Sequence, residues 1–218
     1  MITIQGNPKK TELESANKKV DRLLISIEDM DVFREASQDV NPLYCSDEYA
    51  RRTPYVNRVC YGILGVIAGL ECLQPRTDFI LSKIKVDFSE LLYPGIDYSL
   101  EIIENFPQKA TIKLQDGTRT ALKVIANFKE KTAANLEGNT TWQSPRQEPV
   151  HLKPSDLVKD YTVEGEYGVD RAKMRSLIER FNLSEKGIAE IQLVSLLWSS
   201  YLVGMELPGR QALFTQLS

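Results

Sequence analysis

The feature of the sequence that most constrains the fold is a change of hydrophobic period after residue 73. Residues 61–73 (YGILGVIAGLECL) are apolar on nearly every face of a helix, which is typical of a helix enclosed by other elements. The chain beyond alternates with a period of two, which predicts four strands: 78–88, 97–106, 109–115 and 120–130. One enclosed helix followed by antiparallel strands predicts an α+β fold in which a sheet wraps around the helix.

Shorter signals complete this first unit, which we predict to extend over residues 19–130. Residues 1–18 are polar and are expected to be flexible. Residues 19–33 hold a short apolar strand that leads into a helix. Residues 46–52 have the pattern of a helical turn with Ser46 as its N-cap and acidic residues in its first turn.

The second half of the chain repeats this pattern in part. Polar, proline-bearing residues 131–154 predict a linker. Residues 171–181 then have a helical pattern, and residues 188–205 form another long apolar helix. We therefore predict that residues 155–218 form a partial second copy of the first unit.

The predicted second copy stops early. Its last residues, 205–218, align with residues 71–84, so the rest of the first unit, up to residue 130, has no counterpart. A sheet that lacks this part would expose unpaired strand edges. The chain is therefore expected either to be part of a longer polypeptide or to complete its sheet with another chain, for example in a homodimer.

The composition argues against several classes of function. The net charge of −3 and the isoelectric point near 5.4 do not suit a nucleic-acid-binding surface, which is usually strongly basic. The longest apolar run is too short to cross a bilayer, and no secretory signal is visible at the N-terminus. One histidine, and three cysteines without metal or redox spacing, predict no metal site, and no cofactor is expected. The expected location is the reducing cytoplasm.

The stretch SQDVNPLY, residues 37–44, holds the main candidate for chemistry. A carboxylate such as Asp39 can serve as a general base. Asp and Asn side chains also accept backbone N–H bonds in turns, and proline fixes the backbone that follows. Judged by residue type alone, Asp39, Asn41 and Pro42 are better explained by turn formation than by catalysis.

Three stretches of the first half, taken in order, carry a family resemblance. Residues 37–54 (SQDVNPLYCSDEYARRTP) are similar to a signature in which Gly-Asp-x-Asn-Pro, an aliphatic residue and His precede an acidic helical turn. Residues 59–69 (VCYGILGVIAG) are similar to the start of a central helix, and residues 85–102 to a strand, a Phe-Pro-Gly-Asp turn and a second strand. Over residues 20–130 the chain thus resembles the MaoC-like, R-specific enoyl hydratase and dehydratase family. This implies a hotdog fold, with the second half as an incomplete partner in a double hotdog.

The resemblance also implies a reaction and roles for particular residues. The substrates would be acyl thioesters of coenzyme A or of an acyl carrier protein, and the reaction would be reversible addition of water to a 2-enoyl group. Asp39 matches the catalytic Asp, Asn41 matches the turn, and Gly62 matches the glycine whose backbone N–H polarises the thioester carbonyl. The N-terminus of a helix has free N–H donors that suit this last role.

Departures from the family pattern leave the activity open. Tyr44 stands where the catalytic His is expected, Tyr61 where a His precedes the helix glycine, and Gln38 where a glycine precedes the Asp. Tyr44 could face solvent, fill the former pocket, or donate a hydrogen bond toward Asp39, because a tyrosine with a pKa near 10 is protonated at neutral pH. Tyr61 is more simply pocket lining or core, and Gly62 serves either close packing or carbonyl binding.

Two functions follow from these residues. The first is a hydratase or dehydratase with Asp39 as base, and the retained Asp and Gly favour it. The second is a catalytically lapsed module that binds acyl groups or serves as an interaction domain of a larger biosynthetic enzyme, which the missing His favours. Arg58 could bind a phosphate of the carrier, although a solvated face also suits it. Trp198 and Tyr201 of the second long helix are expected in the core.

Overall fold

The computed structural model describes residues 17–132, 148–151, 167–206 and 216–217. Its strands are β1 (Asn17–Leu24), β2 (Phe79–Phe88), β3 (Asp97–Asn105), β4 (Lys109–Asp116), β5 (Arg119–Glu130) and β6 (Gln216–Leu217). Its longer helices are α1 (Ile27–Ser37), α4 (Gly62–Glu71), α5 (Arg171–Arg180) and α6 (Glu190–Tyr201). Short helical turns are α2 (Pro42–Cys45), α3 (Asp47–Ala50), η3 (Leu183–Glu185) and the π-helical turn η4 (Leu202–Glu206).

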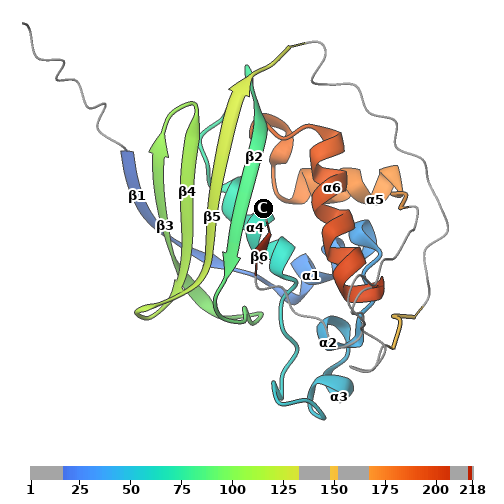
Figure 1. Ribbon diagram of the computed structural model, residues 1–218. Coiled ribbons are helices and arrows are strands. Elements are labelled where there is room, and N and C mark those ends of the chain that lie inside the picture. The colour runs from blue at the N-terminus through green and yellow to red at the C-terminus, as the bar shows by residue number, and fades with distance from the viewer. Residues whose placement is uncertain (1–16, 133–147, 152–166, 207–215, 218) are drawn as a thin grey trace, which may run out of the picture.

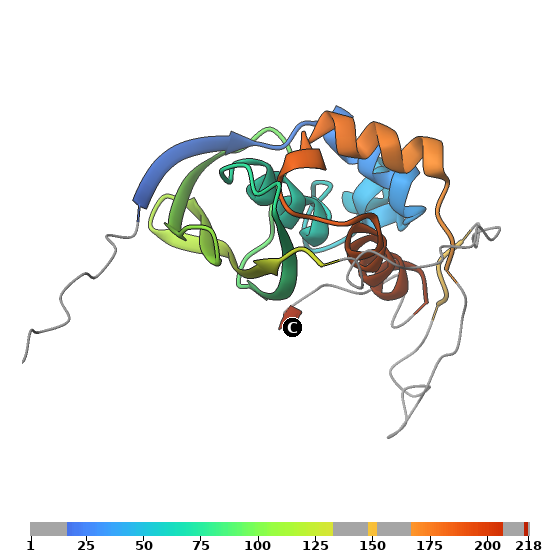
Figure 2. The same ribbon diagram turned by 90° about the horizontal axis from the view of Figure 1, so that it is seen from above.

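The strands form one antiparallel sheet in the order β1-β3-β4-β5-β2-β6. The four strands predicted after the apolar helix are all present, with ends that differ by one residue at most. The sheet curves around α4, while α1, α5 and α6 gather on the side of α4 away from the sheet (Figures 1 and 2). This arrangement confirms the predicted α+β hotdog fold for the first unit.

Helix α4 is enclosed as its sequence predicts. Ile63, Leu64 and Ile67 have no exposed surface, because strands β4 and β5 pack on one side of the helix and α6 and α1 on the other. Its small residues let the sheet approach closely. A Cβ atom at Gly69 would already lie 3.1 Å from the side chain of Ile112 on β4. Within the described residues, no helix is both long and apolar enough to span a membrane.

The second half contributes helices that cover the first unit. α5 packs on α1, and α6 packs on both α1 and α4. The described strand of this half, β6, pairs with the edge of β2 and not with a second sheet. Residues 155–166 of the predicted second unit and much of the linker lie outside the described residues, so a second hotdog copy remains a prediction. The expectation of a core position is met by Tyr201 but is wrong for Trp198, which is 44% exposed on the outer face of α6.

Candidate functional site

The turn that carries Asp39 is built by the residues on either side of it. Helix α1 ends at Ser37, and Gln38 closes it in the left-handed conformation, with φ at 60°. Glycine adopts this conformation without strain, whereas a residue with a Cβ atom does so at a cost of about 1 kcal/mol or more. The Gln38 side chain is also held, because its amide donates to the carbonyl of Gly168 at 3.1 Å. Asn41 then caps α2 by accepting the N–H of Leu43 at 3.0 Å.

The Asp39 side chain is completely buried. Its Oδ1 accepts the backbone N–H of Asn41 at 3.2 Å, and its Oδ2 accepts the hydroxyl of Ser200 on α6 at 2.9 Å. Burial raises the pKa of Asp39 from 3.8 to about 7, because desolvation of the carboxylate outweighs these two hydrogen bonds, which lower it. The carboxyl is therefore poised to exchange a proton near neutral pH.

Backbone from the second half covers the same carboxyl. Gly204 of η4 lies so close that a Cβ atom built on it would be 2.4 Å from Oδ1 and 2.5 Å from Oδ2 of Asp39. The Asn41 side chain holds this backbone in place by donating to the Gly204 carbonyl at 2.9 Å. Tyr167, just before α5, adds a further tie by donating to the carbonyl of Ser37 at 3.0 Å. The candidate base is thus covered by η4, with no exposed surface of its own.

Two tyrosines pack against each other, with tilted rings, close to the turn. Tyr44 and Tyr61 are 4% and 1% exposed, and their rings lie 4.4 Å apart between centroids. The Tyr61 hydroxyl donates to the backbone carbonyl of Asp39 at 2.9 Å, which ties the start of α4 to the turn. Burial raises the pKa of both hydroxyls well above the usual value, so neither acts as a base at neutral pH. Tyr44 therefore does not face solvent, and Tyr61 is a core residue.

Gly62 is the first residue of α4, directly after its N-cap Tyr61. A Cβ atom at Gly62 would lie 2.8 Å from the ring of Phe88 on β2, so glycine permits close packing here. This accounts for one of the two expected roles. The N–H of the residue points from the first turn of the helix, where anions and developing negative charge are stabilised.

Arg58 lies apart from this group. Its Nε donates to Asp47 at 2.8 Å, and its side chain is only 16% exposed. It lines a surface hollow of about 460 Å³ together with Tyr55 and Tyr93, and Asp39 is not among the residues that form this hollow. The structure thus brings together Asp39, Asn41, Tyr44 and Tyr61, with Gly62 next to Tyr61. Arg58, which was predicted to bind a phosphate, lies apart from them.

Ser200 and Gly204 contact the Asp39 carboxyl, and the sequence did not predict either contact. Both lie more than 160 positions from the turn, on a helix whose sequence indicates only burial. No local motif marks a serine or a glycine of an apolar helix as the partner of a distant carboxylate. In the ranges that the structure describes, no group of three or more His, Cys, Asp or Glu side chains is arranged to hold a metal ion.

The architecture is that of a hotdog-type unit. The solved structures similar to the chain include R-hydratases and a MaoC-like dehydratase. One is an (R)-hydratase from A. caviae involved in PHA biosynthesis, at 20% identity and a TM-score of 0.47, covering 55% of this chain and 98% of that one. Another is an R-hydratase from Pseudomonas aeruginosa, at 21% identity and a TM-score of 0.45, covering 65% and 94%. A MaoC-like dehydratase is 10% identical with a TM-score of 0.46, covering 73% and 54%.

These likenesses concern the fold and say nothing about particular residues. No protein-family model and no curated protein matches the chain.

Proposed function

We propose that this chain is a hydratase or dehydratase of acyl thioesters of coenzyme A or an acyl carrier protein. The observation that carries the proposal is the buried carboxyl of Asp39, which sits in the Asp-x-Asn-Pro turn with a pKa of about 7. A group with a pKa near the working pH is effective both as base and as acid, because both forms are populated. Addition and removal of water need both forms in turn.

The proposed reaction uses this one carboxyl for both proton transfers. In hydration, Asp39 takes a proton from water as the water oxygen bonds to C3 of the 2-enoyl group. The electron pair of the C2–C3 double bond moves to the thioester, which becomes an enolate. The protonated Asp39 then returns its proton to C2, so the carboxylate is regenerated. Dehydration follows the same steps in reverse.

The remaining residues position these groups. The Gly62 N–H, in the first turn of α4, is proposed to donate to the enolate oxygen. Tyr61 holds the backbone of Asp39 at a fixed distance from this helix start. In the covered state, Ser200 donates to Oδ2 and so favours the carboxylate form despite its burial.

Catalysis in this form requires the cover to open. Gly204 lies in contact with both carboxyl oxygens, so water and a thioester reach Asp39 only if η4 moves away from the turn. The proposal therefore includes a state in which the bonds from Ser200 and Asn41 to their partners are exchanged for contacts with substrate. In that state the apolar acyl chain takes the place of η4, so the carboxyl stays desolvated and its pKa stays raised. Both bonds are neutral-donor hydrogen bonds of the kind that contribute only about 1 kcal/mol each.

The contact between Gly204 and Asp39 also favours a second candidate, a catalytically lapsed hotdog module. In that case Asp39 anchors the second half of the chain, with Ser200 and Gly204 occupying the space that a substrate would need. The presence of Tyr44 in place of a histidine agrees with such a loss. The module would then serve in acyl binding or in assembly with another chain.

Hydration of a crotonyl thioester by the full chain tests both candidates. Asp39→Asn is a near-isosteric change that keeps the hydrogen-bonding positions, so its far-UV circular dichroism is expected to match the wild type. The first candidate predicts wild-type activity that falls by at least about 100-fold in Asp39→Asn, the order of one acid–base group. Absence of wild-type activity, with activity gained in Tyr44→His, would establish the lapsed module instead.

A further inference from the structure

We propose that the surface hollow beside Arg58 binds a nucleotide, that is, an aromatic base joined to a ribose and a phosphate. The hollow measures about 460 Å³, which lies within the roughly 300–1,000 Å³ of most small-molecule sites. Asp39 does not line it, so the proposal is independent of the chemistry proposed for that carboxyl.

Backbone hydrogen bonds tie together the segments that surround this hollow. The segments are α3 with the loop that follows it, the turn before β3, and the start of α1. The Cys60 N–H donates to the carbonyl of Leu92 at 2.7 Å, which joins the loop to the turn. The Gly95 N–H donates to the carbonyl of Ile25 at 2.9 Å, which joins the turn to the residues before α1. The hollow is therefore formed before any ligand enters it.

The backbone at Val56 is strained. Its φ is 65°, and across it the N–H of Asn57 donates to the carbonyl of Tyr55 at 2.7 Å. A bond between residues two apart, with a positive φ between them, is the rare and strained form of γ-turn, and a β-branched side chain adds to the strain. The Val56 side chain is 57% exposed, so its own packing does not explain the turn. Its neighbours Tyr55 and Asn57 both line the hollow, and strain of this kind collects at ligand sites.

Aromatic and apolar side chains form most of the wall. Tyr55 and Tyr93 are both half-buried. Burial, and after it the neighbouring Tyr55, raise the pKa of the Tyr93 hydroxyl, so this hydroxyl is neutral at physiological pH. Aromatic rings stack on nucleobases of any sequence, because every base has a flat face. The other apolar residues of the wall are Ile27, Pro94 and Ile96.

The polar groups of the hollow match a phosphate and a ribose. The Nε of Arg58 donates to Oδ1 of Asp47 at 2.8 Å, and within the described residues the two terminal nitrogens of Arg58 have no further partner. A guanidinium group fits the geometry of a phosphate, to which it can donate two parallel hydrogen bonds. Oδ2 of Asp47 is left as an acceptor, and acidic side chains accept the hydroxyls of ribose in the same way at known nucleotide sites.

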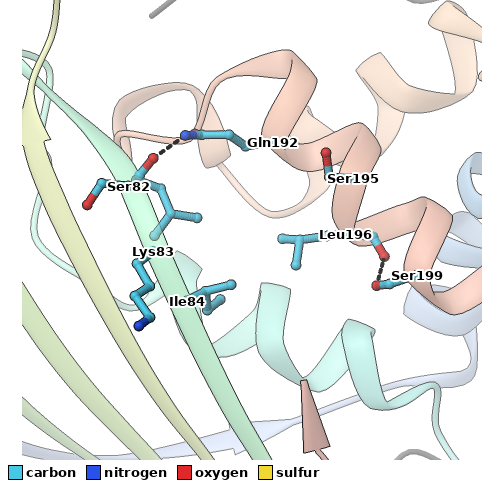
Figure 3. Close-up of a pocket in the computed structure, with 8 residues that line it drawn as sticks. Ser82, Lys83, Ile84, Gln192, Ser195, Leu196 and Ser199 are labelled. Carbon is cyan, nitrogen blue, oxygen red and sulfur yellow. Dashed lines mark hydrogen bonds between the residues drawn. The ribbon is translucent and has the colours of Figure 1, made fainter. Parts of the chain in front are cut away.

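The cavity between β2 and α6 lacks these groups. It measures about 250 Å³, and neither an aromatic side chain nor an arginine is among the described residues that line it (Figure 3). Its cation is Lys83 on β2. The hydroxyls of Ser195 and Ser199 donate to carbonyls of their own helix, at 2.8 Å to Ile191 and at 2.7 Å to Leu196. Lys83 therefore serves as a control cation for Arg58.

Titration calorimetry of the full chain with AMP, adenosine 3′,5′-bisphosphate and adenosine tests the proposal. We expect both nucleotides to bind with a Kd of about 1 mM or below, the range of most metabolite sites. Adenosine is expected to bind at least about tenfold more weakly, because it lacks the charge-assisted hydrogen bonds of the phosphate. Tighter binding of the bisphosphate than of AMP would identify the nucleotide end of coenzyme A as the ligand. Equal or tighter binding of AMP would identify a free nucleotide.

Charge changes at Ile96 locate the phosphate without disturbing the core. Ile96 is 41% exposed and lines the hollow, so Ile96→Glu and Ile96→Lys are both expected to fold as the wild type does. The Kd for AMP should rise about two- to fivefold in Ile96→Glu and fall by a similar factor in Ile96→Lys, the range for one exposed ion pair. The Kd for adenosine should be the same in both.

Removal of the cations provides a second measurement. Arg58→Ala should weaken AMP binding at least about tenfold, whereas Lys83→Ala should leave it unchanged. Equal AMP affinity in Ile96→Glu and Ile96→Lys would overturn the proposal, as would a lack of binding of either nucleotide at up to about 1 mM. An equal loss in Lys83→Ala and Arg58→Ala would also overturn it. Because binding is measured and not hydration, each result holds whether or not the chain is a hydratase.

Discussion

Gly204→Ala is the substitution that most directly tests how the second half of the chain is held over Asp39. A Cβ atom at this position would lie 2.4 and 2.5 Å from the two carboxyl oxygens, about 1 Å closer than ordinary contact. Either the turn or η4 must shift to admit it. Overpacking of this kind costs about 1–3 kcal/mol, and loss of the hydrogen bonds from Ser200 and Asn41 adds about 1 kcal/mol each.

Helix propensity alone would predict that Gly204→Ala stabilises the protein, so a measured destabilisation would report the packing against Asp39. Alanine is favoured over glycine by about 1 kcal/mol inside a helix. The net expectation is therefore a destabilisation of about 2–4 kcal/mol. With a urea dependence of about 2 kcal/mol/M, the unfolding midpoint falls by about 1–2 M. Urea unfolding followed by circular dichroism measures this shift.

Two further variants separate packing at the carboxyl from a general effect on the helix. Ser195→Ala, on the exposed face of α6, is the matched control and is expected to change stability by no more than about 0.5 kcal/mol. In an Asp39→Ala background the new methyl group has room, so Gly204→Ala should cost at least about 1 kcal/mol less than in the wild type. Wild-type or greater stability of Gly204→Ala alone would show that Gly204 is not packed tightly against the Asp39 carboxyl.

Three other expectations follow from buried groups. Because burial raises the pKa of Asp39 from 3.8 to about 7, the folded state binds the Asp39 proton more tightly than the unfolded state does. The free energy of unfolding, relative to that of Asp39→Asn, should therefore be greatest below about pH 4 and fall until about pH 7. Urea unfolding of both proteins across this pH range measures the difference. Arg76 and Glu104 form a buried ion pair at 2.9 Å, so Glu104→Ala should lower the free energy of unfolding by about 3–5 kcal/mol in the same assay. As a control, Glu48→Ala removes one partner of an exposed ion pair and should lower it by less than about 1 kcal/mol. Tyr61→Phe keeps the ring but leaves the Asp39 carbonyl unpaired, and should lower the free energy of unfolding by about 1–3 kcal/mol; an unchanged value would show that this bond is replaced.

Local periodicity was sufficient to predict the elements of the first unit. The strands alternate because one face of the sheet packs on α4, so burial imposes a period of two that is visible without any structure. Helix α4 was predicted over residues 61–73 and is found at Gly62–Glu71. Ser46 was predicted as an N-cap and accepts the N–H of Tyr49 at 3.2 Å. Each of these signals acts within a few residues of the chain.

The exposed position of Trp198 could not be predicted from the sequence of its helix. The sequence of α6 is apolar on several faces, so it gives no basis for choosing which side packs inward. That choice depends on where α1 and α4 lie, and those helices come from distant parts of the sequence. A large apolar residue was therefore assigned to the core and is found at the surface.

The sequence alone predicts the α+β unit and the turn at Asp39, and it shows a tyrosine at position 44 where a histidine was expected. The environment of that carboxyl comes from the tertiary structure: Ser200 donates a hydrogen bond to it, and Gly204 covers it. Burial raises its pKa to about 7, although the Ser200 bond acts in the opposite direction. The physical reason is that desolvation depends on every group packed around an atom. Two of those groups lie more than 160 positions away along the chain, beyond the reach of any local pattern.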